Sequence, residues 1–348
     1  MFTVQMRCTV VLIACFFVLG LDLTFGRCWA QERSVKPASV TESRIKLEKQ
    51  DNRVVVKIDD QLFTEYVFKG YEKPILYPVI GPFGVGMTRN WPMKDGNANE
   101  AKDHPHHKSI WFGHMKVNDE SFWHEGKTAG TTRQTELVSA KGDTIQTRNQ
   151  LVGKDGKTVI ATDSRTIRFE TDGDTRMIEF TVTYHATEGD IKFGDNKDGQ
   201  MGIRMHPALR ISDNKNVVKA VGKKIANGKA INSEGDTEKN IWGKRAKWIA
   251  YWGTVDDCKV GIAVFDHPSN LRHPTWWHAR DYGLLSANPF GIHHFENKKE
   301  PIGEYTLKKG ESLSFRHLFV FYPGDYKSAK IDERYGVWAR SQRNVESF

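Results

Sequence analysis

The chain has 348 residues, of which 39% are hydrophobic and 27% are charged. This composition is that of a globular protein, and it excludes a wholly disordered, collagen-like or disulfide-framework chain. The formal net charge is +8, but residues 213–247 alone hold nine Lys or Arg and four Asp or Glu, which is +5 of that excess. We therefore interpret residues 213–247 as a solvated basic insertion and expect no nucleic-acid partner.

The first thirty residues have the order of an export signal. Arg7 precedes an apolar run over residues 8–21, and Cys28-Trp29-Ala30 places small residues where a signal peptidase cuts. We predict a signal peptide over residues 1–30 and a periplasmic or secreted product. A lipid anchor at Cys15 is the alternative, although it would leave a very short apolar run. No later stretch is apolar and long enough to cross a bilayer, so we expect no membrane span in the mature chain.

The remainder of the chain has the pattern of an all-β protein. Residues 31–44 are polar and form a predicted flexible lead-in. Alternation of apolar and polar side chains then predicts strands at 54–58, 165–170, 178–184, 248–252, 260–265 and 314–322. Residues 326–341 hold the one plausible helix. We expect residues 45–348 to form a single large β-sandwich domain, with Cys258 at a strand end.

Histidines gather in two segments of the chain. Residues 104–124 hold five of the thirteen histidines and residues 267–294 hold another five. Both segments also contain Trp together with acidic or guanidinium groups. Flat aromatic faces and charged hydrogen-bonding groups are what a sugar needs, and histidine transfers protons near neutral pH. The two segments therefore predict one shared site, facing one cleft.

Individual roles follow from residue type. We predict acid/base catalysis by His107, His124 and His278, with Glu125 and Asp281 setting their charge. The predicted substrate-binding residues are Arg89, Trp111, Trp123, Trp277 and Arg280. Two alternatives stay open: the tryptophans could fill the sandwich core, and Arg89 and Arg204 could pair with carboxylates instead of holding an acidic sugar.

Several long segments resemble an exported bacterial family that is usually named "methane oxygenase PmoA". The matching segments lie between about Pro74 and Tyr322, and they read KPILYPVIGP, DHPHHKSIWFGH, FWHE, INSEG, WGKRAKW, FDHPSNLRHPTWWHARDYGLLSANPFG and FYPGD. The family name points to the copper subunit of a membrane-bound methane monooxygenase. This chain lacks the hydrophobic spans of such a subunit, so we do not expect that activity.

The same family is similar in shape to the galactose-mutarotase-like super-sandwich. Proteins of that fold often bind sugars across a concave sheet and use His and acidic groups for proton transfer, which is a fold-level analogy. The resemblance implies an exported carbohydrate-processing enzyme (an epimerase, lyase or hydrolase) with a sugar or oligosaccharide as substrate. This interpretation requires no cofactor.

Two other functional classes remain open. A metal-binding oxidoreductase would use His104 and His106, which alternate on an extended chain, with His114 or His124 completing the site. A non-catalytic glycan-binding module is the other alternative. Metal content of the purified protein distinguishes the first of these classes, and turnover of oligosaccharides distinguishes the second.

Export generates the first testable prediction. In protein made by its natural host, we expect the mature chain to begin at Gln31, which intact-mass measurement detects directly. A mass that includes Met1, or one that includes a lipid attached at Cys15, would contradict cleavage at this position.

Overall fold

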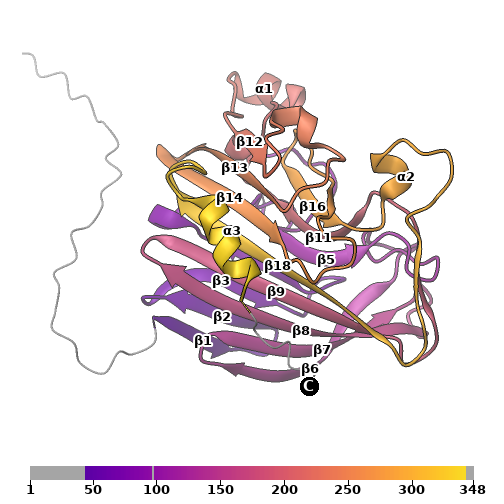
Figure 1. Ribbon diagram of the computed structural model, residues 1–348. Coiled ribbons are helices and arrows are strands. Elements are labelled where there is room, and N and C mark those ends of the chain that lie inside the picture. The colour runs from indigo at the N-terminus through magenta and orange to yellow at the C-terminus, as the bar shows by residue number, and fades with distance from the viewer. Residues whose placement is uncertain (1–43, 96–97, 342–348) are drawn as a thin grey trace, which may run out of the picture.

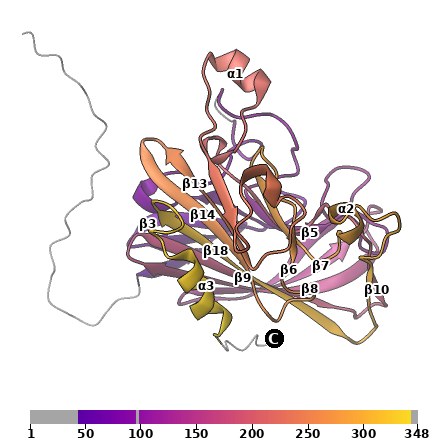
Figure 2. The same ribbon diagram turned by 45° about the horizontal axis from the view of Figure 1, so that its top comes forward.

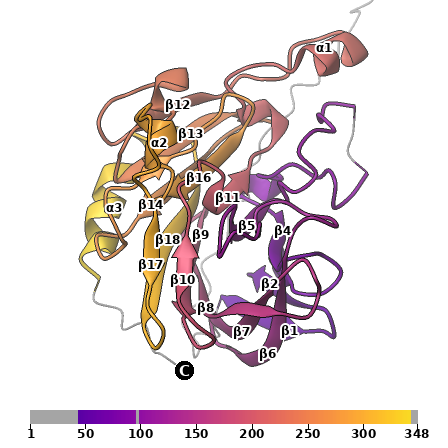
Figure 3. The ribbon, with the colours of Figure 1, turned by 90° about the vertical axis from the view of Figure 1, so that its right-hand side faces the viewer.

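The computed structural model describes residues 44–95 and 98–341, and its strands form two eight-stranded antiparallel sheets and one short ribbon. We call them sheet I and sheet II. Figures 1 and 3 show the sheets as two stacked layers. In spatial order, sheet I consists of β1 (Ile45–Lys49), β2 (Arg53–Ile58), β3 (Gln61–Val67), β4 (Ile75–Val79), β5 (Ile110–His114), β11 (Gly199–Arg204), β16 (Leu284–Asn288) and β15 (Trp276–Trp277).

Sheet II contains the longest strands. In spatial order it consists of β12 (Lys229–Asn232), β13 (Trp248–Val255), β14 (Cys258–Asp266), β18 (Ser312–Pro323), β9 (Thr175–His185), β8 (Val159–Asp172), β7 (Thr144–Val152) and β6 (Thr131–Lys141). A short ribbon pairs β10 (Ile191–Phe193) with β17 (Tyr305–Leu307). The predicted all-β sandwich is confirmed, and each predicted strand segment overlaps an observed strand.

Helices are few and short. They are α1 (Lys215–Val221), α2 (Ile292–Phe295) and α3 (Ile331–Ala339), with 3₁₀ turns η1 (Pro82–Gly84), η2 (Pro207–Leu209) and η3 (Glu238–Ile241). Helix α3 lies within the segment predicted to be helical and packs Ile331, Tyr335 and Trp338 against the outer face of sheet II. Within the described ranges, no helix is long and apolar enough to span a membrane.

The basic insertion over residues 213–247 is only partly a surface loop. Helix α1 projects from the body of the molecule (Figure 2) and buries only Val217. Strand β12, however, pairs with β13 at the edge of sheet II, with Ile231 opposite Ala250. The prediction of a purely solvated insertion is therefore wrong for β12, because Ala230 and Asn232 are buried there.

The core lies between the two sheets and follows from the period of two. Alternate residues of a strand point to opposite faces, so Val54 and Val56 of β2 reach the core while Val55 faces outward. From sheet II, Ile167 and Phe169 of β8 meet them from the other side. The outer face of sheet I is then free to carry polar and aromatic groups.

One ion pair is buried in this apolar interior. Arg165 donates two hydrogen bonds to Asp163, from Nε to Oδ1 at 2.9 Å and from Nη2 to Oδ2 at 3.0 Å. Both side chains are 1% exposed. Asn149 of β7 donates a further bond of 2.6 Å to Asp163 Oδ1. The buried carboxylate of Asp163 therefore takes its hydrogen bonds from Arg165 and Asn149, two neighbours in sheet II.

Some sequence predictions fall on residues outside this description. The signal peptide over residues 1–30 and nearly all of the lead-in over 31–44 lie outside the described residues. Arg44, at the end of that lead-in, donates two hydrogen bonds to Asp59 at 3.0 and 2.8 Å. A single domain over residues 45–348 stays a prediction. Cys258 is buried at the first residue of β14, where a strand end was predicted.

The buried pair gives a stability prediction. Asp163→Asn leaves the Arg165 guanidinium charged without its partner, and breaking a buried pair in this way costs about 3–5 kcal/mol. We expect the double variant Asp163→Leu with Arg165→Met to be clearly more stable than Asp163→Asn, since no uncompensated charge remains. Urea unfolding measures both. If Asp163→Asn unfolds at the same urea concentration as the parent, the pair does not support the core.

Candidate functional site

The candidate site begins with one outward-facing tryptophan of sheet I. In β5, Ile110 and Phe112 point into the core, so Trp111 points to the outer face. It lies flat there because the neighbouring strand β11 has Gly202 opposite it. A Cβ atom at Gly202 would lie 2.7 Å from Trp111 Cζ2. Trp123 packs beside Trp111, with ring centroids 5.0 Å apart, and both indoles are fully buried.

The loop over residues 101–108 crosses above these rings and is held by Arg89. The Arg89 guanidinium is 2% exposed and donates to the carbonyl oxygens of Ala101, Asp103, His104 and His107 at 2.9–3.3 Å. These bonds order a segment that has no regular secondary structure. Arg89 is therefore occupied by the loop, and its predicted role in substrate binding is not what the structure shows.

Two arginines meet at the carboxylate of Asp103. Oδ1 of Asp103 accepts from Arg89 Nη1 at 2.6 Å and from Arg204 Nη2 at 2.7 Å. Burial alone would raise the pKa of Asp103, but the hydrogen bond from His104 and the charges of Arg204 and Arg89 hold it well below its usual range. Of the two alternatives for Arg89 and Arg204, the pairing with carboxylates is the one that the structure contains.

A second carboxylate has the same arrangement. Glu125 accepts a hydrogen bond of 2.7 Å from Lys73 and another from Lys108. Lys73 is 2% exposed, Lys108 is 9% exposed and Glu125 is 14% exposed. Burial opposes ionisation of Glu125, yet the two ammonium groups lower its pKa. Both oxygens of Glu125 are occupied by lysines, and its charge raises the pKa of the neighbouring His106, so its effect on the charge of His107, His124 and His278 stays a prediction.

His107 lies between the arginines and the tryptophans. Its ring stacks on Trp111 at 5.2 Å with an interplanar angle of 16°. Arg204 Nη1 lies 3.1 Å from His107 Nδ1. An arginine can only donate, so Nδ1 accepts and the proton of the neutral ring is on Nε2. His107 is 2% exposed, and its stack on Trp111 therefore fixes this end of the loop to the tryptophan layer.

Three more histidines lie above this buried layer. The His106 ring meets His124 at 4.5 Å and His107 at 4.4 Å, both edge to face. His104 is 41% exposed and stacks on Tyr282 at 5.1 Å. Tyr282 belongs to the second histidine-rich segment, so the structure brings the two segments together on one face of sheet I. His106 and His124 are half-buried and open to solvent on one side.

The second segment contributes His278 through Asp198. His278 Nδ1 lies 3.6 Å from Asp198 Oδ1, and the Asp198 charge also acts on His124. His278 is placed by backbone pairing with Ser286 on β16. The turn before it is anchored by Asp266 of sheet II, which accepts from the His273 ring at 2.7 Å and from the Thr275 amide at 3.0 Å.

Burial decides the protonation state of these histidines. It lowers the pKa of His106 to about 3, with the neighbouring His124 adding to the effect. It lowers the pKa of His278 to about 4 against the opposing charge of Asp198, and it takes that of His107 well below its usual value. The pKa of His124 is also lowered, mainly by burial. All four rings are therefore neutral at pH 7.

Other predicted residues lie elsewhere. Asp281 pairs with Lys239 at 3.2 Å and not with a histidine. Trp277 points into the inter-sheet core, where its indole donates to the Ala246 carbonyl at 2.9 Å, so its predicted role in binding is wrong. Arg280 is half-buried, with its guanidinium 5.6 Å from the centre of the Tyr282 ring, and remains beside the site.

The proposed metal set is not assembled. His114 shares the inward face of β5 with Phe112, and its Nε2 donates to the Gly194 carbonyl at 2.8 Å. His104 and His106 lie in the loop above the opposite face. Among the residues that the structure describes, no group of three or more His, Cys, Asp or Glu side chains could hold a metal ion.

Sequence reasoning missed several members of the site. Lys73, Asp103 and Lys108 lie within the distinctive segments KPILYPVIGP and DHPHHKSIWFGH, so their position in those segments was an available signal. Tyr282 likewise lies within the segment FDHPSNLRHPTWWHARDYGLLSANPFG. Asp198 carried no comparable signal, and it becomes recognisable only when β11 and β16 are placed beside β5.

Comparison with known proteins places the chain in a family. A family model described as "Family of unknown function (DUF6807)" matches residues 53–336. The chain belongs to this family. The family description carries no activity, and it gives no support to the name methane oxygenase for this DUF6807 member. No curated protein matches the sequence.

Solved structures were also compared with this DUF6807 member. The Slr1438 protein of Synechocystis has 11% identity, with 84% of this chain and 99% of that chain covered and a TM-score of 0.32. A galactose mutarotase related enzyme from Lactobacillus acidophilus has 8% identity, 81% and 98% coverage and a TM-score of 0.33. A putative aldose 1-epimerase from Escherichia coli K12 has 12% identity, 80% and 99% coverage and a TM-score of 0.32.

The neutral histidines predict a pH dependence of stability. A histidine whose pKa is lower in the folded state binds its proton more readily after unfolding, so its contribution is complete above about pH 6.5 and is lost as the pH falls toward 4. We expect the urea midpoint to fall between pH 7 and pH 4, and to fall less in His278→Asn, whose side chain does not titrate. Lys157→Gln, an exposed change in the β7–β8 connection, is the control. Parallel curves for His278→Asn and the parent would contradict the prediction.

Proposed function

We propose that this protein is a carbohydrate-processing enzyme in which a neutral histidine of the His106–His124 pair removes a proton from a sugar. The observation that carries the proposal is this pair of half-buried rings, 4.5 Å apart, next to four cationic side chains whose direct ion pairs, within the described residues, are with the carboxylates of Asp103 and Glu125. An epimerase or a lyase is the reaction class that this arrangement supports best.

The charge balance supports an anionic intermediate. Arg89, Arg204, Lys73 and Lys108 are all nearly buried, whereas the carboxylates that they contact are those of Asp103 and Glu125. The pKa of Arg204 falls only to about 9, mainly through burial, so this guanidinium is still charged at pH 7. Fixed positive charge in a water-poor site stabilises negative charge that develops during a reaction. Removing a proton from a carbon next to a carbonyl or carboxylate creates such charge.

The protonation states favour a base over an acid as the first catalytic group. A neutral imidazole accepts a proton, and among the four neutral rings His106 and His124 are the two that are not buried. A hydrolase with two carboxyl groups needs one of them protonated at the working pH. Asp103 and Glu125 both have lowered pKa values because cations contact them. Within the site, neither carboxyl group is suited to donate a proton near pH 7.

A glycan-binding module is the alternative function, and a measurement of sugar turnover distinguishes it from an enzyme. The test is incubation of the protein in D₂O with a panel of aldoses, ketoses and uronates, followed by NMR. We expect deuterium to appear at a carbon-bound position, or an unsaturated product to form, in the parent. Each of His106→Asn and His124→Asn should slow this reaction by about 10²-fold or more while glycan binding is retained, since positioned acid/base groups contribute about 10²–10⁴-fold.

A matched control is His185→Asn. His185 lies at the end of β9 on sheet II and bonds to Ser164 and Ser312 at 2.9 and 3.0 Å, so we expect parental turnover. Equal rates in the parent, His106→Asn and His124→Asn would remove the two histidines from catalysis. Binding of glycans without conversion of any of them would establish the binding module, and loss of activity with a chelator would establish a metal site.

A further inference from the structure

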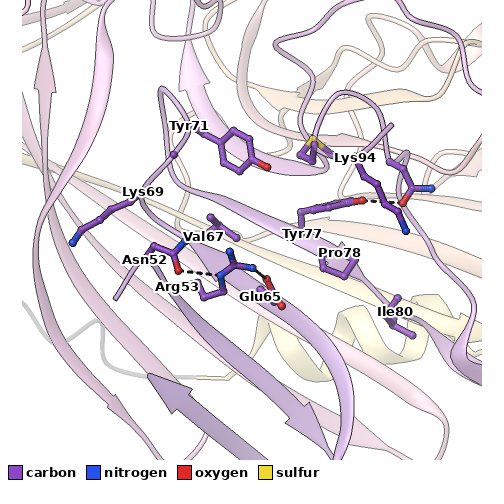
Figure 4. Close-up of a pocket in the computed structure, with 13 residues that line it drawn as sticks. Asn52, Arg53, Glu65, Val67, Lys69, Tyr71, Tyr77, Pro78, Ile80 and Lys94 are labelled. Atoms are coloured by element: carbon purple, nitrogen blue, oxygen red, sulfur yellow. Dashed lines mark hydrogen bonds and ion pairs between the residues drawn. The ribbon is translucent and has the colours of Figure 1, made fainter. Parts of the chain in front are cut away.

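A large cavity lies on the same outer face of sheet I as the histidines. Its volume is about 710 Å³, and it covers β2, β3 and β4. The residues that line it are Asn52, Arg53, Glu65, Val67, Lys69, Gly70, Tyr71, Tyr77, Pro78, Ile80, Asn90, Met93 and Lys94. Figure 4 shows Tyr71 and Tyr77 along one side of the cavity, with Arg53 and Glu65 opposite them.

The cavity and the candidate site share one apolar layer. Val67, Ile75, Trp111, Trp123 and Leu284 form its buried part. Tyr71, Tyr77 and Met93 pack on this layer from the cavity, and Tyr282 packs on it from the histidine side. Lys108, which bonds to Glu125 of the site, also lies 5.7 Å from the centre of the Tyr71 ring. A ligand that occupies the cavity is therefore adjacent to the proposed catalytic groups.

The distance between the cavity and the histidines sets the minimum size of a ligand that occupies both. The strand order is β3, β4, β5, so Glu65 and Val67 on β3 are two strand spacings from Trp111 on β5. At 4.7–4.9 Å per spacing this is about 10 Å. A single sugar ring cannot fill the cavity and also lie over His106. A chain of linked sugars can do both.

The lining indicates the charge of the ligand. The cavity has three cations, Arg53, Lys69 and Lys94, and one carboxylate, Glu65. Arg53 is already bonded to Glu65 and to Asn52 Oδ1. In the described part of the chain, the Lys69 and Lys94 side chains form no ion pair with the protein, and Figure 4 shows them at opposite ends of the cavity, with Arg53 between them in the view. The excess positive charge favours an anionic ligand.

The uncharged lining favours a sugar. Tyr71 and Tyr77 are half-buried, so one face of each ring packs on the protein and the other is open to the cavity. Tyr77 donates a hydrogen bond of 2.9 Å to Asn90 Oδ1, which fixes the ring. Fixed aromatic faces beside amides and charged groups match the C–H faces and the hydroxyls of a pyranose.

We propose that this cavity is a binding subsite for an acidic sugar unit, a uronate, of an oligosaccharide whose neighbouring unit lies at His106 and His124. The assignment rests on the proposed function for the second of these two positions, and it specifies the substrate as an anionic oligosaccharide. Lys69 and Lys94, at the two ends of the cavity, are the cations available to its carboxylate, and Tyr71 and Tyr77 contact its ring.

The experiment compares the parent with the double variant Lys69→Gln, Lys94→Gln. Both lysines are exposed, so folding should be preserved. The control is Lys157→Gln with Lys219→Gln, which removes the same charge from exposed positions outside the cavity. The probes are galacturonate and glucuronate, short oligogalacturonides and hyaluronan oligomers, and neutral cello- and galacto-oligosaccharides. Calorimetry measures Kd at low and at physiological salt.

We expect the parent to bind at least one acidic oligomer more tightly than the monomeric uronate. The cavity variant should bind that oligomer about tenfold more weakly, since two exposed charge contacts are lost, and the difference should shrink at higher salt. The control variant should bind as the parent does. Tyr71→Ala should weaken binding at both salt concentrations equally, because its contact is not ionic.

Three results would overturn the assignment: no acidic oligomer bound by the parent, equal affinity for monomer and oligomer, or equal affinity in the parent and the cavity variant. The proposed function fails separately. If the binding pattern is as expected but no probe exchanges deuterium or is converted, the cavity binds acidic glycans and the histidines are not catalysts. If turnover of short sugars is unchanged in the cavity variant and no oligomer is preferred, the proposed enzyme activity is retained and the proposed subsite is wrong.

Discussion

The candidate site depends on the pair of arginines that share Asp103. The loop over residues 101–108 has no helix or strand to order it, and Arg89 replaces that order with hydrogen bonds to four of its carbonyl oxygens. Arg204 then connects the same carboxylate to His107 and so to the strand β11. The loop that carries His104 and His106 is thus held by two guanidinium groups that are each 2% exposed. A buried charge is stable only with partners, and Asp103 and the carbonyl oxygens of the loop provide them for Arg89.

Burial has the largest effect on the pKa of each site histidine, and at His278 it acts against the neighbouring charge of Asp198. Asp198 raises the pKa of His278, yet that pKa still falls to about 4. For Asp103 and Glu125, the combined effect of the cations on the pKa exceeds that of burial, because each carboxyl group contacts two cations directly. Direct ion pairing outweighs the loss of water, whereas a charge at 3.6 Å does not. The outcome is a site in which the acids are ionised and the histidines are neutral.

Much of the fold could be predicted from the sequence, since a period of two fixes which strand residues face the core. The same period explains the errors. His114 and Trp277 were grouped with the site because of their neighbours in the sequence, but their strands turn them inward. Partners were harder still. Asp281 and Glu125 carry the right charge for pairing with histidine, and only the three-dimensional structure shows that lysines contact them first. The place of Asp198 in the site could be recognised only from the pairing of strands that are far apart in the sequence.

Asp266 extends the site into the opposite sheet. It belongs to β14, is 1% exposed, and fixes the turn that leads to His278. A residue of sheet II therefore helps to position a side chain on the outer face of sheet I. A random-mutagenesis screen for loss of activity would return positions on both sheets, and a map of those positions on the surface would not outline the site. In such a screen, an inactive variant that still folds would identify a distant anchor as readily as a residue that contacts the proposed substrate.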